Sequence, residues 1–149
     1  MSVDADTLPE GAPFAIGEAL FAALFGAAAL AGATVLDNPV KLSALADGAR
    51  IVFFEDVSDR ALDQAGGVQK RTYTFNVGVI NRTTAARRGA HGDYRAAKRV
   101  VRAALKELRV VAQVASNLRE GDVTYRIENI DVGGGLVLGT FSVDYRDPG

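Results

Sequence analysis

Few residues of this chain have the side chains that catalysis or metal binding needs. His91 is the only histidine, and cysteine is absent. A pair of histidine ligands, a thiolate nucleophile and a cysteine zinc site are therefore excluded. The glycines at 133–135 lie between two predicted strands, so no helix dipole follows them to bind a phosphate. The sequence predicts that the chain is not an enzyme and has no catalytic residue, cofactor or metal site.

Four acidic side chains form the densest group of carboxylates. These are Glu55, Asp56, Asp59 and Asp63. Carboxylates are the ligands of hard cations, but these four do not follow the alternating spacing of a calcium-binding loop. We expect a solvated loop from Ser58 to Gln69, with the acids as candidate contacts to another chain.

The basic residues are concentrated on one predicted helix, residues 93–109. At about 100° per residue its apolar side chains fall within one arc. The bases fall in the adjacent arc and are Arg95, Lys98, Arg99, Arg102, Lys106 and Arg109. Like charges four residues apart repel by roughly 0.2–0.5 kcal/mol per pair in an isolated helix. A solvated face normally mixes signs, so this face indicates an anionic neighbour, with acids of the same or another chain as the first candidates.

Two other interpretations of the basic face remain open. It can be a solvated face, or it can bind nucleic acid. A single-strand binding surface interleaves aromatic side chains with its bases. This helix has only Tyr94, which falls on the apolar side.

Charge alternates in blocks along the whole chain, although the net charge is only −1. Residues 1–66 carry ten acids and three bases, residues 67–119 carry twelve bases and two acids, and residues 120–149 carry six acids and two bases. Oppositely charged blocks favour association between copies of a chain or with partners.

Length and composition fit one domain without disulfides. A chain of 149 residues buries roughly two-thirds of its unfolded surface. Residues 1–13 are polar and are expected to form a flexible arm, and residues 14–149 a single α+β domain. The apolar stretch from Ala19 to Leu36 is rich in alanine and glycine and follows acids, so it predicts a packed helix and not a membrane span or signal peptide.

Periodicity predicts the order helix, strand, strand, helix, strand, strand, with a four-stranded mixed sheet packed by the two helices. The first helix covers about Pro13 to Ala31, and its spacing places Ile16, Leu20, Leu24 and Ala27 or Ala28 on one face. The first strand, Ile51–Phe54, is apolar on both faces and ends at Glu55-Asp56. In the second strand Tyr73, Phe75, Val77 and Val79 alternate with polar residues.

The second half of the chain continues this order. A polar loop at 81–92 precedes the basic helix, which Asp93 is expected to N-cap. Residues 110–118 fit either an extension of that helix or a separate turn. A phase change near Glu128-Asn129 indicates a bulge. A glycine hairpin then leads to a last strand with Val137, Phe141, Val143 and Tyr145 on its core face.

This order of elements, with its sequence segments, resembles a known family. The segments are IVFFEDVSD, RTYTFNVGVINRT, HGDYRAAKRVVRAALKEL and YRIENIDVGGGLVLGTFSVDYRDP. They look like the tail-terminator proteins of long-tailed bacteriophages, the lambda-like minor tail proteins and their Mu-like relatives. The resemblance covers roughly residues 14–148 and depends on element order, with no single diagnostic motif.

The resemblance implies a structural virion protein that closes into a homohexameric ring. The ring would cap the tail tube, stop its polymerisation and offer its other surface to the head-side connector or neck protein. DNA would pass through it without sequence-specific binding. The expected location is the head-proximal end of the virion tail, after assembly in the host cytoplasm and with no membrane contact. A head-completion or neck protein, and a nucleic-acid-binding module using the helix 93–109, are the alternatives.

Overall fold

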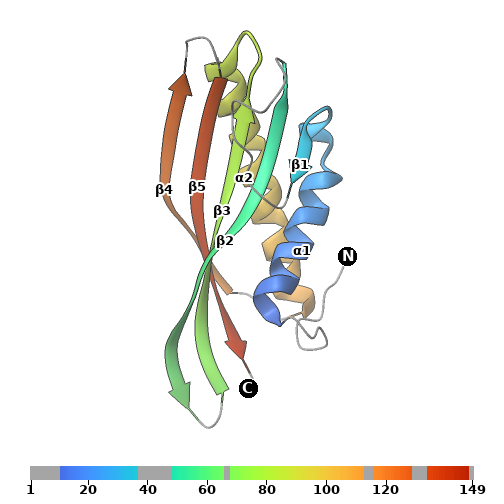
Figure 1. The fold of residues 1–149 in the computed structure, drawn as a ribbon. Helices are drawn as coiled ribbons and strands as arrows, with labels where there is room; N and C mark the ends of the chain where they lie inside the picture. Colours follow the sequence, from blue (N-terminus) through green and yellow to red (C-terminus); the bar gives the residue numbers. More distant parts are fainter. Residues whose placement is uncertain (1–10, 37–47, 66–67, 113–115, 129–133, 148–149) are drawn as a thin grey trace.

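The chain forms one layer of helices on one face of a β-sheet (Figure 1). The computed structural model describes residues 11–36, 48–65, 68–112, 116–128 and 134–147. Side chains are described throughout these ranges except at 62–65, 68–69, 107–112, 116–117, 127–128 and 146–147. The elements are α1 (Ala12–Phe25), the 3-10 turn η2 (Ala28–Leu30), β1 (Thr34–Leu36), β2 (Arg50–Ala65), β3 (Val68–Asn81), α2 (Ala86–Ala112), β4 (Ser116–Glu128) and β5 (Gly134–Asp147).

The predicted α+β class is confirmed, but the described residues form a sheet of five strands and not four. Its order is β1-β2-β3-β5-β4. β1 runs parallel to β2, and the other neighbours are antiparallel. The additional strand, β1, pairs Thr34 with Ile51 and Leu36 with Phe53. Three residues are too few to show a period of two, which is why the sequence pattern did not reveal it.

Helix α1 is shorter than the predicted helix from Pro13 to Ala31. It ends at Phe25, and Gly26 caps it. Glycine is among the poorest helix formers. After Gly26 the chain turns through η2, which buries Leu30. The predicted core face is confirmed for Ile16, Leu20 and Leu24, which are all buried.

β2 and β3 form a long hairpin, which corrects the prediction that the first strand ends at Glu55-Asp56. β2 continues to Ala65, and β3 begins at Val68, so the segment from Ser58 to Gln69 is mostly strand. Two register shifts, at Asp56/Ser58 and Ala61/Asp63, interrupt the pairing. The distal end of this hairpin extends beyond the ends of both helices (Figure 1). The acidic residues of this hairpin are typical of a loop in sequence. Partners on the neighbouring strand allow them to lie in a strand.

Helix α2 begins at Ala86, so the predicted loop at 81–92 and the N-cap role of Asp93 are both wrong. Asp93 lies inside the helix and is buried. The turn before the helix is organised by Asn81, whose side-chain oxygen accepts hydrogen bonds from the backbone N and the hydroxyl of Thr83. The ambiguous stretch 110–118 divides between two elements, because α2 runs to Ala112 and β4 starts at Ser116.

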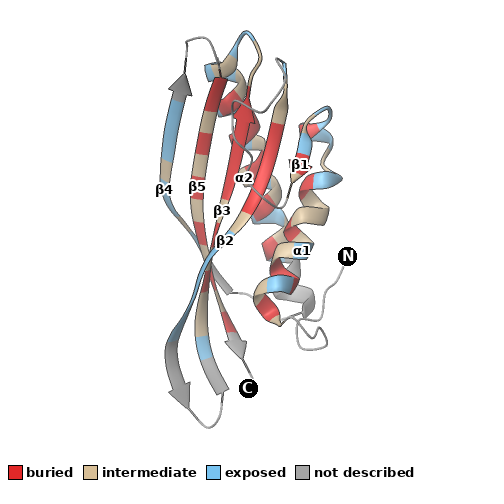
Figure 2. Ribbon diagram, viewed as in Figure 1, coloured by how far each residue is buried: buried red, intermediate tan, exposed pale blue. Residues whose placement is uncertain are grey.

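The main core lies between the helices and the sheet (Figure 2). The predicted inward residues Tyr73, Phe75, Val77 and Val79 of β3 are buried, as are Val137, Phe141, Val143 and Tyr145 of β5. Phe75 is at the centre, with ring centroids 5.1 Å from Phe54, 5.4 Å from Tyr73 and 5.6 Å from Phe141. Such aromatic contacts add stability beyond the apolar area they bury.

The start of β2 is buried on both faces, as predicted. Val52 and Phe54 belong to the main core, whereas Ile51 and Phe53 join Ile80 in a second cluster on the opposite face of the sheet. Gly78 is required here, because a Cβ at this position would lie 2.2 Å from the Phe53 ring.

β4 and β5 are antiparallel neighbours, as the predicted hairpin requires. Their register shifts lie at Ser116/Arg119 and Glu120/Val123. Asn129 of the predicted bulge and Gly133 of the predicted hairpin lie outside the described residues. Gly134 and Gly135 are the first residues of β5.

Candidate assembly interface

The basic face of α2 is present on the helix as predicted. Arg95, Arg99, Arg102 and Lys106 are exposed, while Tyr94, Ala97, Val101 and Leu105 are buried on the other side. Among the described residues, no salt bridge is formed by these four bases. Arg109 is in the helix, but its side chain is outside the described set. Among the described residues, no acidic side chain therefore offsets the repulsion between these four bases.

Lys98 differs from the four exposed bases Arg95, Arg99, Arg102 and Lys106, because the structure gives it an ion-pair partner within the chain. Its Nζ lies 3.0 Å from Oε1 of Glu120 on β4, and the Lys98 side chain is 34% exposed. The hydroxyl of Tyr94 donates to Oε2 of the same carboxylate at 3.3 Å. Burial, helped by this carboxylate, raises the pKa of the Tyr94 phenol. Lys98 thus anchors α2 to β4, a role that the sequence could not assign without the position of Glu120.

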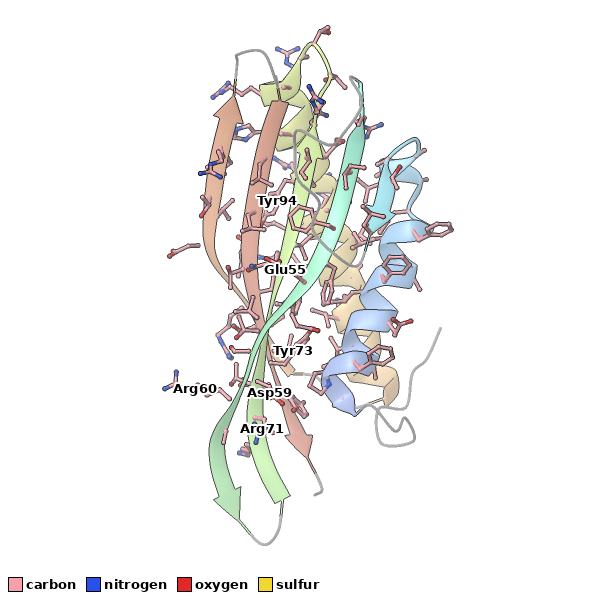
Figure 3. The ribbon with its side chains drawn as sticks, viewed as in Figure 1. Glu55, Asp59, Arg60, Arg71, Tyr73 and Tyr94 are labelled. Atoms are coloured by element: carbon pink, nitrogen blue, oxygen red, sulfur yellow. The ribbon has the colours of Figure 1, made fainter. Side chains whose placement is uncertain are left out.

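Two of the predicted interface acids, Asp56 and Asp59, lie on the helix-facing side of the β2–β3 hairpin. Asp56 accepts a hydrogen bond from the hydroxyl of Tyr73. Asp59 accepts one from Arg71 Nε at 3.1 Å and one from the Tyr145 hydroxyl at 2.6 Å. Figure 3 shows Asp59, Arg71 and Tyr73 together where the hairpin leaves the body of the molecule. These acids therefore stabilise the hairpin within the chain.

Glu55 lies on the opposite face of the sheet. Its carboxylate accepts a hydrogen bond from the Asn76 side chain at 2.7 Å, and Thr140 in turn donates to Asn76 at 2.8 Å. Asp63 is paired in register with Lys70, and its side chain is outside the described set. Because Glu55 lies on the other face of the sheet from Asp56 and Asp59, the predicted acids do not form one patch. None of these three contacts the basic face of α2 within the chain.

An aromatic pair that the sequence did not indicate lies beside the basic face. The His91 ring stacks on Tyr125 of β4, with centroids 4.8 Å apart and planes inclined by 18°. Tyr125 is 53% exposed and His91 is also exposed. The stack depends on His91 being in a helix that lies over β4, and the prediction of a loop at 81–92 hid this relation.

Helix α1 exposes a second group of aromatic side chains. Phe14 is 47% exposed and Phe25 is 74% exposed, and Phe21 stacks on Phe25 with centroids 6.4 Å apart. The spacing of these phenylalanines is visible in the sequence, but their exposure is not, because apolar residues lie on several sides of this helix. The expected helix was therefore interpreted only from its buried residues.

In the described part of the chain, no group of three or more histidine and acidic side chains could hold a metal ion. Among the same residues, none of the helices combines the length and apolarity needed to cross a membrane.

Comparison with known proteins gives a likeness of fold. No family model matches the chain, and no curated protein matches it. A chain from the virion of a native gene transfer agent particle has a similar solved structure, with a TM-score of 0.51 and 18% sequence identity. The match covers 88% of this chain and 94% of that chain. The two chains share an architecture over nearly their whole lengths.

Proposed function

We propose that this chain is a structural, non-enzymatic virion protein, and specifically a tail terminator that forms a hexameric ring on the end of a tail tube. The observation that carries the proposal is the fold likeness to a chain of a gene transfer agent virion, which extends over 94% of that chain. A likeness limited to a common substructure would support it much less. The resemblance in element order to phage tail terminators supports the finer role.

The surface of the molecule is consistent with assembly. A cyclic ring is built from heterologous contacts, in which one patch meets a different patch of the next copy. The basic face of α2 is one such patch, because Arg95, Arg99 and Arg102 are exposed and need anionic groups nearby. The acids of the β2–β3 hairpin are candidate counterparts on a neighbouring copy, although Asp59 and Glu55 already have partners within the chain.

The basic face also constrains the ring. Six such faces lining a channel would bind the phosphates of passing DNA and release counter-ions. A tail must let DNA move, so the face belongs at a contact between protomers or on an outer docking surface. A ring structure with Arg95, Arg99 and Arg102 in the central channel would refute this arrangement.

Electron microscopy of the purified protein mixed with polymerising tail-tube subunits tests termination. Rings on tube ends, with tubes of limited length, are the expected result. Tubes that grow without limit would contradict a terminator. If rings form but bind only to the head-side connector, the chain is a neck protein.

Nucleic-acid binding is the second candidate, since the exposed Tyr125–His91 stack lies beside the basic face. Base stacking and phosphate contacts use this combination of side chains. Retention on DNA that falls steeply with salt, without assembly, would favour this role over the ring.

A further inference from the structure

The phenylalanines of α1 lie along one side of the helix, where Phe14 and Phe25 are exposed and Phe21 between them is half-buried against the core. Phe14, Glu18, Phe21 and Phe25 follow one another at intervals of four, three and four residues, which places them on one face of a helix. That face is opposite the buried Ile16, Leu20 and Leu24. We call these four residues the α1 stripe. Large aromatic side chains grouped on a surface mark a contact with another molecule more often than isolated ones do.

The α1 stripe and the basic face belong to two helices that pack against each other, with α1 and β4 on opposite sides of α2. α1 packs near β1 and β2, and β1 is one edge of the sheet. α2 packs over β3 and β5 and contacts β4, the other edge. On that side Arg95, Arg102 and the His91–Tyr125 stack form what we call the α2–β4 flank. Figure 1 shows the two helices side by side, with β4 on the far side of α2 from α1.

The two surfaces are chemically complementary. Arginine side chains stack on aromatic faces through cation–π contacts, and Arg95 and Arg102 are exposed to do so. Tyr125 offers a further exposed ring to the phenylalanines. Glu18 is the exposed acid of the stripe and would face those bases. Protein interfaces are enriched in this combination of aromatic side chains and arginine.

We infer that the α1 stripe of one copy binds the α2–β4 flank of the next copy, with Phe14 and Phe25 as the apolar centre of the contact. This inference rests on the proposed ring and adds the contact between its copies. When two different patches meet, each pair of copies keeps one free α1 stripe and one free α2–β4 flank, so further copies can add. The occupant of the stripe is thus a second copy of this chain.

The absence of cysteine makes the contact testable by cross-linking. One chain carries Phe25→Cys and another carries Arg102→Cys, and they are mixed at high concentration with a short bifunctional maleimide. Each variant alone and a mixture of Val57→Cys with Arg102→Cys serve as controls, since Val57 on β2 is also 52% exposed. The expected result is a heterodimer from the first mixture in clear excess over all controls.

A second measurement follows the association itself, by sedimentation. Phe25→Ser is expected to raise the concentration needed for half-assembly by about tenfold or more, since it removes a large apolar group from the contact. Val57→Ser should leave that concentration unchanged. Because Phe25 is exposed, both variants should keep the melting temperature of the parent chain.

Three outcomes would overturn the inference. Cross-links between two Phe25→Cys chains would indicate a symmetric contact between α1 helices. Assembly with preferential Val57–Arg102 cross-links would place the hairpin, and not α1, on the basic face, while leaving the proposed ring intact. A wild-type chain that stays monomeric at all concentrations would show that the chain does not bind itself through these surfaces. The proposed function has its own test, because unlimited growth of tail tubes would contradict it whichever surfaces the copies use.

Discussion

The guanidinium of Arg50 is held by the carboxylate of Asp93 in a two-pronged ion pair. Arg50 Nη2 lies 2.7 Å from Oδ1 and Nε lies 3.1 Å from Oδ2. The Asn81 side chain donates a third hydrogen bond to Oδ2 at 3.2 Å. The hydrogen bonds that the Arg50 guanidinium donates to Asp93 raise the pKa of Arg50. One carboxylate on α2 thus joins the first residue of β2 to the last residue of β3.

Replacing Asp93 by alanine is predicted to destabilise the fold by about 1.5–3 kcal/mol, because hydrogen bonds to charged groups contribute that much and Asn81 loses a buried acceptor. Asp93 is only 8% exposed, so water cannot fully replace its carboxylate as the hydrogen-bond acceptor for Arg50 and Asn81. Urea unfolding followed by circular dichroism measures the change. Asp122→Ala on β4, at an exposed position, is the matched control and should change the free energy of unfolding by less than about 0.5 kcal/mol.

Two glycines of α2, three residues apart, are predicted to respond to alanine in opposite directions. A Cβ at Gly89 would lie 2.4 Å from Nδ2 of the buried Asn81, whereas nothing lies within 4 Å of a Cβ at Gly92. Gly92→Ala should stabilise the helix by about 0.5–1 kcal/mol. Gly89→Ala should destabilise by about 1–3 kcal/mol, because it forces Asn81 out of place. Equal shifts in melting temperature for the two variants would show that Asn81 is not packed against the helix in this way.

Stability is predicted to fall above the ordinary tyrosine pKa of about 10. Burial, and the Asp56 carboxylate that accepts its hydrogen bond, raise the pKa of the Tyr73 phenol. Since the folded state retains the proton that the unfolded state loses, the stabilisation is complete below pH 10 and declines as pH rises. The slope for one such group is at most about 1.4 kcal/mol per pH unit.

Thermal melting between pH 8 and 11 checks this. Tyr73→Phe should flatten the alkaline decline, although it lowers stability at neutral pH by removing the hydrogen bond to Asp56. Tyr125→Phe is the control, since Tyr125 is 53% exposed. If both variants decline as steeply as the parent chain, the alkaline loss comes from a group other than Tyr73, such as Tyr94, whose pKa burial also raises.

The sequence predicted correctly those features that follow from the pattern of apolar and polar residues within a single helix or strand. The alternation in β3 and the two arcs of α2 are of this kind, and both are seen in the structure. The errors occurred where a partner distant in sequence decides. Asp56 and Asp59 look like loop residues until Tyr73 and Tyr145 supply their hydrogen bonds. Asp93 looks like a helix cap until Arg50, 43 residues away, is placed beside it.

The same limit applies to the candidate interface. The exposed bases of α2 could be identified from the sequence because helical periodicity alone separates them from the core. Lys98 could not be distinguished from the others without Glu120, which β4 places 3.0 Å away. The α1 stripe was missed for a different reason. Exposure of Phe14 and Phe25 depends on which side of α1 the sheet covers, and the sequence contains apolar residues on several sides of that helix.

Charge reversal on α2 provides the last prediction and separates the two candidate partners of the basic face. Arg102→Glu should weaken association strongly, because a carboxylate replaces an exposed base at the contact. If the α1 stripe is the partner, Glu18→Arg on the other copy should restore association. If the hairpin is the partner, Glu55→Lys should restore it instead. Light scattering at two salt concentrations gives the measurement. The restored pair should lose strength as salt rises, because salt screens exposed charges. If Arg102→Glu weakens association and neither change restores it, the basic face contacts another surface of the neighbouring copy.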